Sequence, residues 1–186
     1  MKNIIFKGPR VTLRPIRLSD APNYVRWLND KTVVRYLLAQ QGVTLPAEKK
    51  YIRNILKKNS SNNNFAIIDE SGAHIGSASL DELNPVHKSA VFGIVIGDKS
   101  CWGKGNAGEC IKLLANYLFE RLKYNRLELK VAAHNKAAVA AYRKAGFVVE
   151  GKLRQHEWNR VTKRFEDNLV MSILREEWVK KYKNKF

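Results

Sequence analysis

The stretch WGKGNAGE, residues 102–109, decides the fold, because it joins an apolar run that ends at Ile96 to a strongly amphipathic segment. From Ala107 to Leu122, apolar residues recur every three or four positions, which predicts a helix with one apolar face. The glycines would let the main chain approach a ligand closely, and the first amides of the helix would point at it. We therefore expect an anion site, suited to phosphate, at the start of this helix.

The glycines match two nucleotide-binding patterns only in part. Residues 103–108 read G-x-G-x-x-G, but no acidic residue follows the next strand to hold a ribose, and the preceding strands look antiparallel. A P-loop needs four residues between its glycines and a Ser or Thr after its lysine, whereas Gly105 follows Lys104 here. Neither nucleotide-binding fold is favoured, and a glycine-rich turn without a ligand stays open as an alternative.

The elements on either side of this stretch follow from periodicity and turn residues. Before it, the sequence predicts a strand over 11–16, a helix that begins near Asp20, a helix over 46–58 capped by Thr44, a polar loop over 59–64, and strands over 65–69, 75–80 and 90–96. After the helix that begins at Ala107, it predicts a strand over 127–131, a helix over 137–145 that ends at a left-handed Gly146, and strands over 148–158 and 164–174. This order indicates an α/β (α+β) fold with a mixed, mostly antiparallel sheet and helices on both faces.

Composition limits the class of protein. The chain has 186 residues, 45% of them hydrophobic and 10% aromatic, which fits one compact domain over 1–186. No apolar run approaches the roughly 20 residues that span a bilayer, and no export signal is visible, so we expect a cytoplasmic protein without a membrane partner. Cys101 and Cys110 form no CxxC pair, and the four histidines have no metal-ligand spacing, so no metal is expected.

The charge balance is strongly basic. Lys and Arg number 34 against 17 Asp and Glu, which gives a formal net charge of +17. Such a field attracts anionic ligands and partners and repels small polycations. A general bias toward a lysine-rich surface explains the same number equally well.

Two motifs resemble the signatures of the GNAT superfamily of N-acetyltransferases. The first is similar to the acyl-CoA pyrophosphate loop, Gln/Arg-x-x-Gly-x-Gly/Ala, in which Gly105 and Ala107 match and Trp102 replaces the Gln/Arg. The second, NKAAVAAYRKAGF over 135–147, resembles an asparagine followed by a helix with a tyrosine and then Gly-Phe. Residues 13–15, 151–154 and 173–178 resemble the branch of ribosomal-protein, spermidine and amino-sugar acetyltransferases. The resemblance spans nearly the whole chain and implies a GNAT-like fold and an acetyl-CoA-dependent N-acetyltransferase.

The resemblance also implies where acetyl-CoA binds. Pantetheine would lie where two neighbouring parallel strands, over 93–96 and 129–133, splay apart. The residues expected at the cofactor are Ile94, Val95, Ile96, Trp102, Gly103, Lys104, Gly105, Asn106, Ala107, Gly108, Asn135 and Tyr142. Asn135 has a second explanation as the cap of the helix that follows it. Tyr142 is the expected acid that protonates the leaving thiolate, and its alternative role is a buried aromatic of a short helix.

The remaining roles are less determined. Carboxylate candidates for the general base are Glu128 and Glu82, with His156 and Glu157 behind them, although ordered water could serve instead. The resemblance places the acceptor pocket at Tyr24, Trp27, Arg35, Arg154, His156 and Asp167. Asn159-Arg160 stands where many relatives have a glycine turn, so this wall departs from the family pattern.

The acceptor amine stays open between several classes. A protein N-terminal amine, such as that of a ribosomal protein with ribosome association, and a nucleotide-linked amino sugar both suit a basic enzyme. A polyamine ranks lower at this stage, because its site should collect carboxylates and a protein of net charge +17 repels it. An alternative of another class is a non-enzymatic acyl-CoA- or RNA-binding protein. A homodimer through edge strands is compatible with the sequence.

Overall fold

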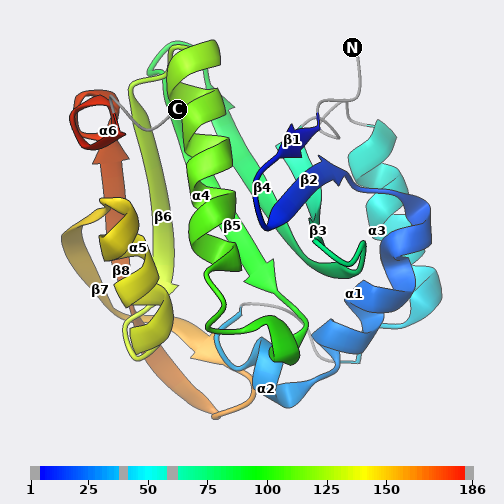
Figure 1. Ribbon diagram of the computed structural model, residues 1–186. Helices are drawn as coiled ribbons and strands as arrows, with labels where there is room; N and C mark the ends of the chain where they lie inside the picture. The colour runs from blue at the N-terminus through cyan, green and yellow to red at the C-terminus, as the bar shows by residue number, and fades with distance from the viewer. Residues whose placement is uncertain (1–4, 38–41, 58–62, 183–186) are drawn as a thin grey trace.

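A single eight-stranded sheet organises the computed structural model, which describes residues 5–37, 42–57 and 63–182 (Figure 1). The strands lie in the order β1-β2-β3-β4-β5-β6-β8-β7, and β5 and β6 are the parallel neighbours in an otherwise antiparallel sheet. The strands are β1 (Phe6–Lys7), β2 (Val11–Pro15), β3 (Asn64–Asp69), β4 (His74–Asn84), β5 (Ser89–Ile96), β6 (Arg126–Ala132), β7 (Val148–Asn159) and β8 (Arg164–Leu174). The mixed, mostly antiparallel sheet predicted from the sequence is confirmed.

Most helices connect these strands at the places that the sequence indicates. They are η1 (Leu18–Asp20), α1 (Ala21–Leu28), α2 (Lys31–Val34), α3 (Leu45–Lys57), η3 (Lys99–Cys101), α4 (Asn106–Asn116), η4 (Tyr117–Arg121), α5 (Lys136–Ala145) and α6 (Arg175–Tyr182). The short α2 and η3, the C-terminal α6 and the two-residue β1 were not predicted, because short elements leave weak periodicity. Residues 58–62, most of the expected polar loop, lie outside the described residues, and Asn64 already belongs to β3.

The helix predicted from Ala107 to Leu122 is correct in position but changes type along its length. The α-helix ends at Asn116, and the chain continues to Arg121 as a π-helix. The predicted apolar face is confirmed, since Ile111, Leu114 and Leu118 are completely buried against the sheet. Each such side chain contributes about 1.5–3 kcal/mol through burial, so this face fixes α4 across the sheet (Figure 1).

The two faces of the sheet have different coverings, and β4 shows the difference. Ala78 and Leu80 belong to the apolar core that α4 and α5 complete. Ser77, Ser79 and Asp81 alternate with them and therefore face the opposite side, where they line a cavity under α1 and α3. The core and the cavity thus share one strand.

The pairing between β5 and β6 is unusually short. It covers three pairs, of which the last joins Val91 to Glu128, although β5 runs on to Ile96 and β6 to Ala132. Beyond Val91, β5 keeps its pairing with β4 as far as Ile96. The predicted parallel pair that splays apart is thus present, and we call this point the fork.

Candidate active site

The predicted anion site is built mainly from the backbone. Gly103 and Gly105 have left-handed φ angles of 73° and 86°, which favour glycine, and Gly105 is the N-cap of α4. The first amides of a helix have no partner within the helix. At α4 these amides follow directly on the glycine turn, so an anionic group fits here without a side chain in its way.

Side chains outside the turn hold it in place. The Trp102 indole Nε1 donates to the Ile96 carbonyl at 2.7 Å, and the Arg10 guanidinium donates to the Lys104 carbonyl at 2.7 Å. Oε1 of Glu109, on the first turn of α4, accepts from the Arg10 amide at 2.8 Å. These contacts tie the turn to the end of β5 and to the start of β2, so its shape is set before any ligand arrives.

Helix α5 presents the second motif. The Asn135 Oδ1 accepts from the Ala138 amide at 3.1 Å, so the helix-capping role is present. Gly146 ends the helix at a φ of 110°, as predicted. Tyr142 is 8% exposed, and its ring contacts Phe92 of β5 edge-on at a centroid distance of 6.4 Å. Burial raises the pKa of Tyr142 to about 12, so the phenol keeps its proton at neutral pH.

A cavity of about 720 Å³ lies on the face of β4 opposite the α4 core. Its walls come from α1, α3, β3, β4 and the part of β5 beyond the fork, and they include Gly93, Ile94 and Val95. This cavity therefore extends to residues 93–95 of β5, which also border the gap toward β6.

Two carboxylates line this cavity, and they differ in depth. Glu48 of α3 is 6% exposed and has neither an ion pair nor a side-chain hydrogen bond among the described residues. Burial raises the pKa of this carboxyl group, because water no longer solvates its charge. A buried carboxylate without a partner favours a cationic ligand, since such a ligand would supply the missing counter-charge.

Asp81 of β4 lies at the more exposed rim. Its Oδ2 accepts from the Ser79 hydroxyl at 2.6 Å. Partial burial raises the pKa of Asp81 against the lowering effect of that hydrogen bond, and the charge of Glu82 raises it further. The cavity therefore carries negative charge in a protein whose net charge is strongly positive.

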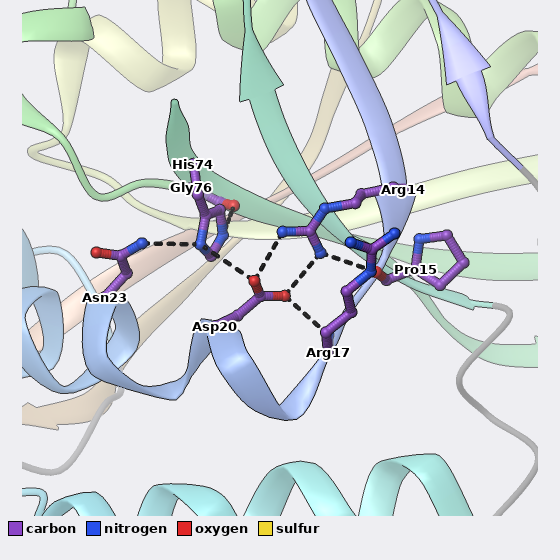
Figure 2. A network of polar contacts seen from close by, with 7 residues as sticks. All are labelled: Arg14, Pro15, Arg17, Asp20, Asn23, His74 and Gly76. Carbon is purple, nitrogen blue, oxygen red and sulfur yellow. Dashed lines mark hydrogen bonds and ion pairs between the residues drawn. The ribbon is translucent and has the colours of Figure 1, made fainter. Parts of the chain in front are cut away.

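A buried polar network fixes the wall that α1 contributes (Figure 2). The Arg14 guanidinium donates to both Asp20 oxygens, at 2.8 and 2.7 Å, and the Arg17 amide donates to Oδ2 at 2.8 Å. His74 of β4 faces the same carboxylate, with its Nδ1 3.8 Å from Oδ1. Burial opposes ionisation of Asp20, yet these contacts together hold the pKa of its carboxyl group below the ordinary value. The network joins β2, η1 and β4 just before α1 begins.

The predicted acceptor residues divide into two groups. Tyr24 lines the cavity. Trp27 lies behind it, packed edge-on against His74 at 4.9 Å and against Gly97, where an added Cβ would be 2.0 Å from the indole. Arg35 reaches the β7–β8 hairpin, since its carbonyl accepts from Asn159 Nδ2 at 2.7 Å.

The hairpin residues predicted at the acceptor do not line this cavity. Arg154, His156 and Asp167 belong to β7 and β8. Asp167 is committed to other partners, because it pairs with Lys152 at 2.6 Å and accepts from the Gln155 amide at 2.7 Å. The expectation that this hairpin and α1 form one pocket is therefore not met within the cavity described here.

The predicted base candidates also lie outside the cavity. Glu128 pairs with the Arg126 guanidinium at 2.8 Å, and Glu82 has a left-handed φ of 48° where the register between β4 and β5 shifts. Sequence reasoning missed Glu48 and Asp81. The alternation of Ser77, Ser79 and Asp81 was a readable signal of a polar strand face, whereas Glu48 looks like any surface acid of a helix.

The cysteines and the length of the helices complete the description. Cys101 and Cys110 are both buried free thiols. Among the residues that the structure describes, no helix is both long and apolar enough to cross a membrane.

Comparisons with known proteins agree with the geometry. The family described as acetyltransferase (GNAT) domain matches residues 10–148. The spermidine N(1)-acetyltransferase of Escherichia coli K12 is 31% identical over 175 residues, which cover 93% of this chain and 90% of that protein. An uncharacterized N-acetyltransferase of Bacillus licheniformis is 29% identical over 172 residues, 91% of this chain and 95% of that protein.

One solved structure extends the comparison to the fold. It is the spermidine N-acetyltransferase from Vibrio cholerae in complex with CoA and spermine, with a TM-score of 0.83 and 26% sequence identity. The alignment covers 92% of this chain and 99% of that one. The overall fold is thus similar to that of a protein whose crystals hold both CoA and spermine.

Proposed function

The chain belongs to the GNAT family of acetyltransferases and is an acetyl-CoA-dependent N-acetyltransferase, and from this premise we propose that its acceptor is a polyamine. The reaction joins the acetyl group to a primary amine of the polyamine and releases CoA. Relatives described as spermidine acetyltransferases support this choice, and none of the relatives named above is described as acting on a protein.

The observation that carries the proposal is the unpaired Glu48 carboxylate inside the cavity. A polyamine brings several ammonium groups, and one of them would neutralise Glu48 while another stays near the fork. The net charge of +17 does not oppose a polyamine at this site, because interactions within a few ångströms outweigh distant surface charges that salt screens. The same carboxylates disfavour a nucleotide-linked amino sugar, whose pyrophosphate they would repel.

The residues at the fork fit acetyl-CoA. The backbone from Gly103 to Gly108 would hold the pyrophosphate, and β5 beyond Val91 offers an unpaired edge toward β6 for an extended group. Acetyl-CoA supplies the activated thioester. Tyr142 would protonate the leaving thiolate, since its pKa near 12 keeps the proton available at neutral pH.

The test is CoA release from acetyl-CoA by the purified protein with four acceptors, read together with the mass of the product. The acceptors are spermidine, a monoamine of similar length, a ribosomal-protein N-terminal peptide and an amino-sugar nucleotide. We expect rapid acetylation of spermidine. Acetylation of the peptide or the sugar nucleotide in preference to spermidine would contradict the proposal.

Glu48→Gln sharpens the same test. Without its charge, the KM for spermidine should rise about tenfold or more, as expected for a lost charge-assisted hydrogen bond. The KM for the monoamine should stay within about twofold, because a single ammonium placed at the fork does not need Glu48. An equal rise for both amines would contradict the role given to Glu48.

A further inference from the structure

Asp81 lies beside the fork itself. In the sheet register Asp81 is opposite Val91, the residue at which β5 stops pairing with β6. Its neighbour on the same face of β4, Ser79, is opposite Gly93. The carboxylate and the hydroxyl therefore overlie the first residues of β5 that border the gap.

The close approach depends on a glycine. A Cβ on Gly93 would lie 2.6 Å from the Ser79 hydroxyl oxygen and 3.4 Å from Asp81 Oδ2. Any larger residue would displace the hydroxyl that holds the carboxylate at 2.6 Å. The absence of a side chain at position 93 thus lets an acidic group sit directly against the backbone of β5.

Tyr142 lies on the opposite face of β5, beside residues 91–93. Its ring packs on Phe92, which points into the α4 core, whereas Gly93 faces the cavity. Asp81 and Tyr142 therefore flank the fork from its two faces. A nucleophile that enters from the cavity meets Asp81, and a leaving group on the α5 side meets Tyr142.

From this arrangement we infer that Asp81, held by Ser79, is the proton acceptor for the amine. The ammonium gives one proton to Asp81, and its nitrogen lone pair forms the bond to the acetyl carbonyl carbon. The bond from that carbon to sulfur breaks, and the thiolate takes a proton from Tyr142. The second proton of the amine restores Tyr142, and Asp81 returns the first proton to water, so the sum is one amide, one thiol and one released proton.

The groups that face Asp81 suit this role. Ser79 donates to it, Glu82 is its neighbour along β4, and Tyr51 and Glu48 of α3 lie across the cavity. Among the described residues no cation pairs with Asp81, so the carboxylate is available to accept a proton. Glu82, the candidate suggested by sequence, adds charge beside Asp81 but does not line the cavity.

The test is the pH dependence of kcat/KM for Asp81→Asn, measured with the amine that the wild-type protein acetylates fastest. At pH 7 we expect a loss of about 100-fold, the lower end of the range for a positioned base. The loss should shrink as the pH approaches about 10, where an alkyl amine loses its proton to water unaided. Thermal unfolding confirms that the variant folds.

Ser79→Ala provides a second readout. The hydroxyl lowers the pKa of Asp81, so its removal should move the acid limb of the pH profile to higher pH. Glu70→Gln in the β3–β4 turn is the matched control and should leave kcat/KM unchanged. An Asp81→Asn variant with a higher KM, an unchanged kcat and an unchanged profile would overturn the inference, as would a loss caused by Glu82→Gln instead.

The inference rests on the proposed function only for the choice of amine. A wild-type protein that acetylates another amine but no polyamine would contradict the proposed function. Full activity of Asp81→Asn on that same amine would contradict the inference.

Discussion

In the proposed function, the two sides of the fork recognise their ligands by different means. On the cofactor side, the main chain of residues 103–108 and the N-terminus of α4 would provide the contacts, so a short contiguous stretch would make the site. On the acceptor side, the side chains of Tyr24, Glu48 and Asp81 come from α1, α3 and β4. The first kind of site tolerates changes of side chain but not of backbone conformation, and the second kind behaves in the opposite way.

The largest expected effect lies where the two sides meet. Tyr142→Phe should lower turnover by about 10² to 10⁴, because the leaving thiolate loses its acid. Acetyl-CoA binding, measured by titration calorimetry, should stay within about twofold of the wild-type value.

Tyr182→Phe is the control for that variant. Tyr182 is another buried tyrosine, and its hydroxyl donates to the Ala145 carbonyl of α5 at 3.2 Å. Its loss should cost about 1 kcal/mol of unfolding free energy without changing turnover. Similar losses of turnover in both variants would mean that Tyr142 acts through packing.

The next effect tests whether the acceptor wall depends on its side-chain network. Asp20→Asn leaves Arg14 without its buried counter-charge, so the free energy of unfolding at pH 7 should fall by about 3 to 5 kcal/mol. The pKa of Asp20 is lowered in the folded protein, so its contribution is present above the unfolded pKa and is lost as the pH falls through the folded pKa. Urea unfolding at pH 7 and pH 3 should therefore show a smaller gap from wild type at pH 3.

Asp20→Asn should also weaken amine binding under conditions in which the protein is still folded. Asp20→Asn should raise the KM for the amine more than the KM for acetyl-CoA, since the network drawn in Figure 2 includes Asn23 of α1 and no residue of the glycine turn, 103–108. Equal changes in both constants would contradict the separation of the two sides.

Backbone recognition predicts a smaller effect on the cofactor side. Gly105→Ala places a Cβ on a left-handed residue, which costs about 1 kcal/mol, and shifts the amides of the turn. We expect the Kd for acetyl-CoA to rise about tenfold. Gly72→Ala is the matched control, because its φ of 83° gives the same strain in the β3–β4 turn. It should lower stability equally and leave the Kd unchanged.

The smallest effect concerns the stability cost of the acceptor site. Burial raises the folded pKa of Glu48, so its ionisation destabilises the fold once the pH rises above the unfolded pKa. Glu48→Gln should therefore raise the melting temperature slightly at pH 7 and leave it unchanged below about pH 4. A lower melting temperature at pH 7 would show that the carboxylate stabilises the fold.

These differences explain how far the sequence could predict the molecule. The meander and the helix at Ala107 follow from local periodicity and turn residues, the parallel pair of β5 and β6 follows from the family resemblance, and the structure confirms all three. The role of residues 103–108 follows from a contiguous motif, and it stays a prediction until binding is measured. Such features depend on neighbours along the chain, which a single sequence displays.

The cavity under α1 and α3 is built from distant parts of the chain, and the sequence did not predict the carboxylates that line it. The resemblance implies Arg154 and Asp167 at the acceptor, which stays a prediction, whereas the carboxylates that line the cavity belong to β4 and α3. Net charge gave no guide to these carboxylates either, because a sum over the surface does not report the field inside one cavity. Glu48 shows its role only through its burial without a partner.

The short pairing of β5 with β6 divides the sheet into two parts that are joined by few hydrogen bonds. Three residue pairs connect the part that contains β1 to β5 with the part that contains β6, β8 and β7. Both parts of the sheet pack against α4 and α5, so these helices hold the two parts together (Figure 1). Amide protons of residues 92–96 that point toward β6 should exchange faster with deuterium than those bonded to β4. A ligand that occupies the gap should slow this exchange and connect the two parts of the sheet more firmly.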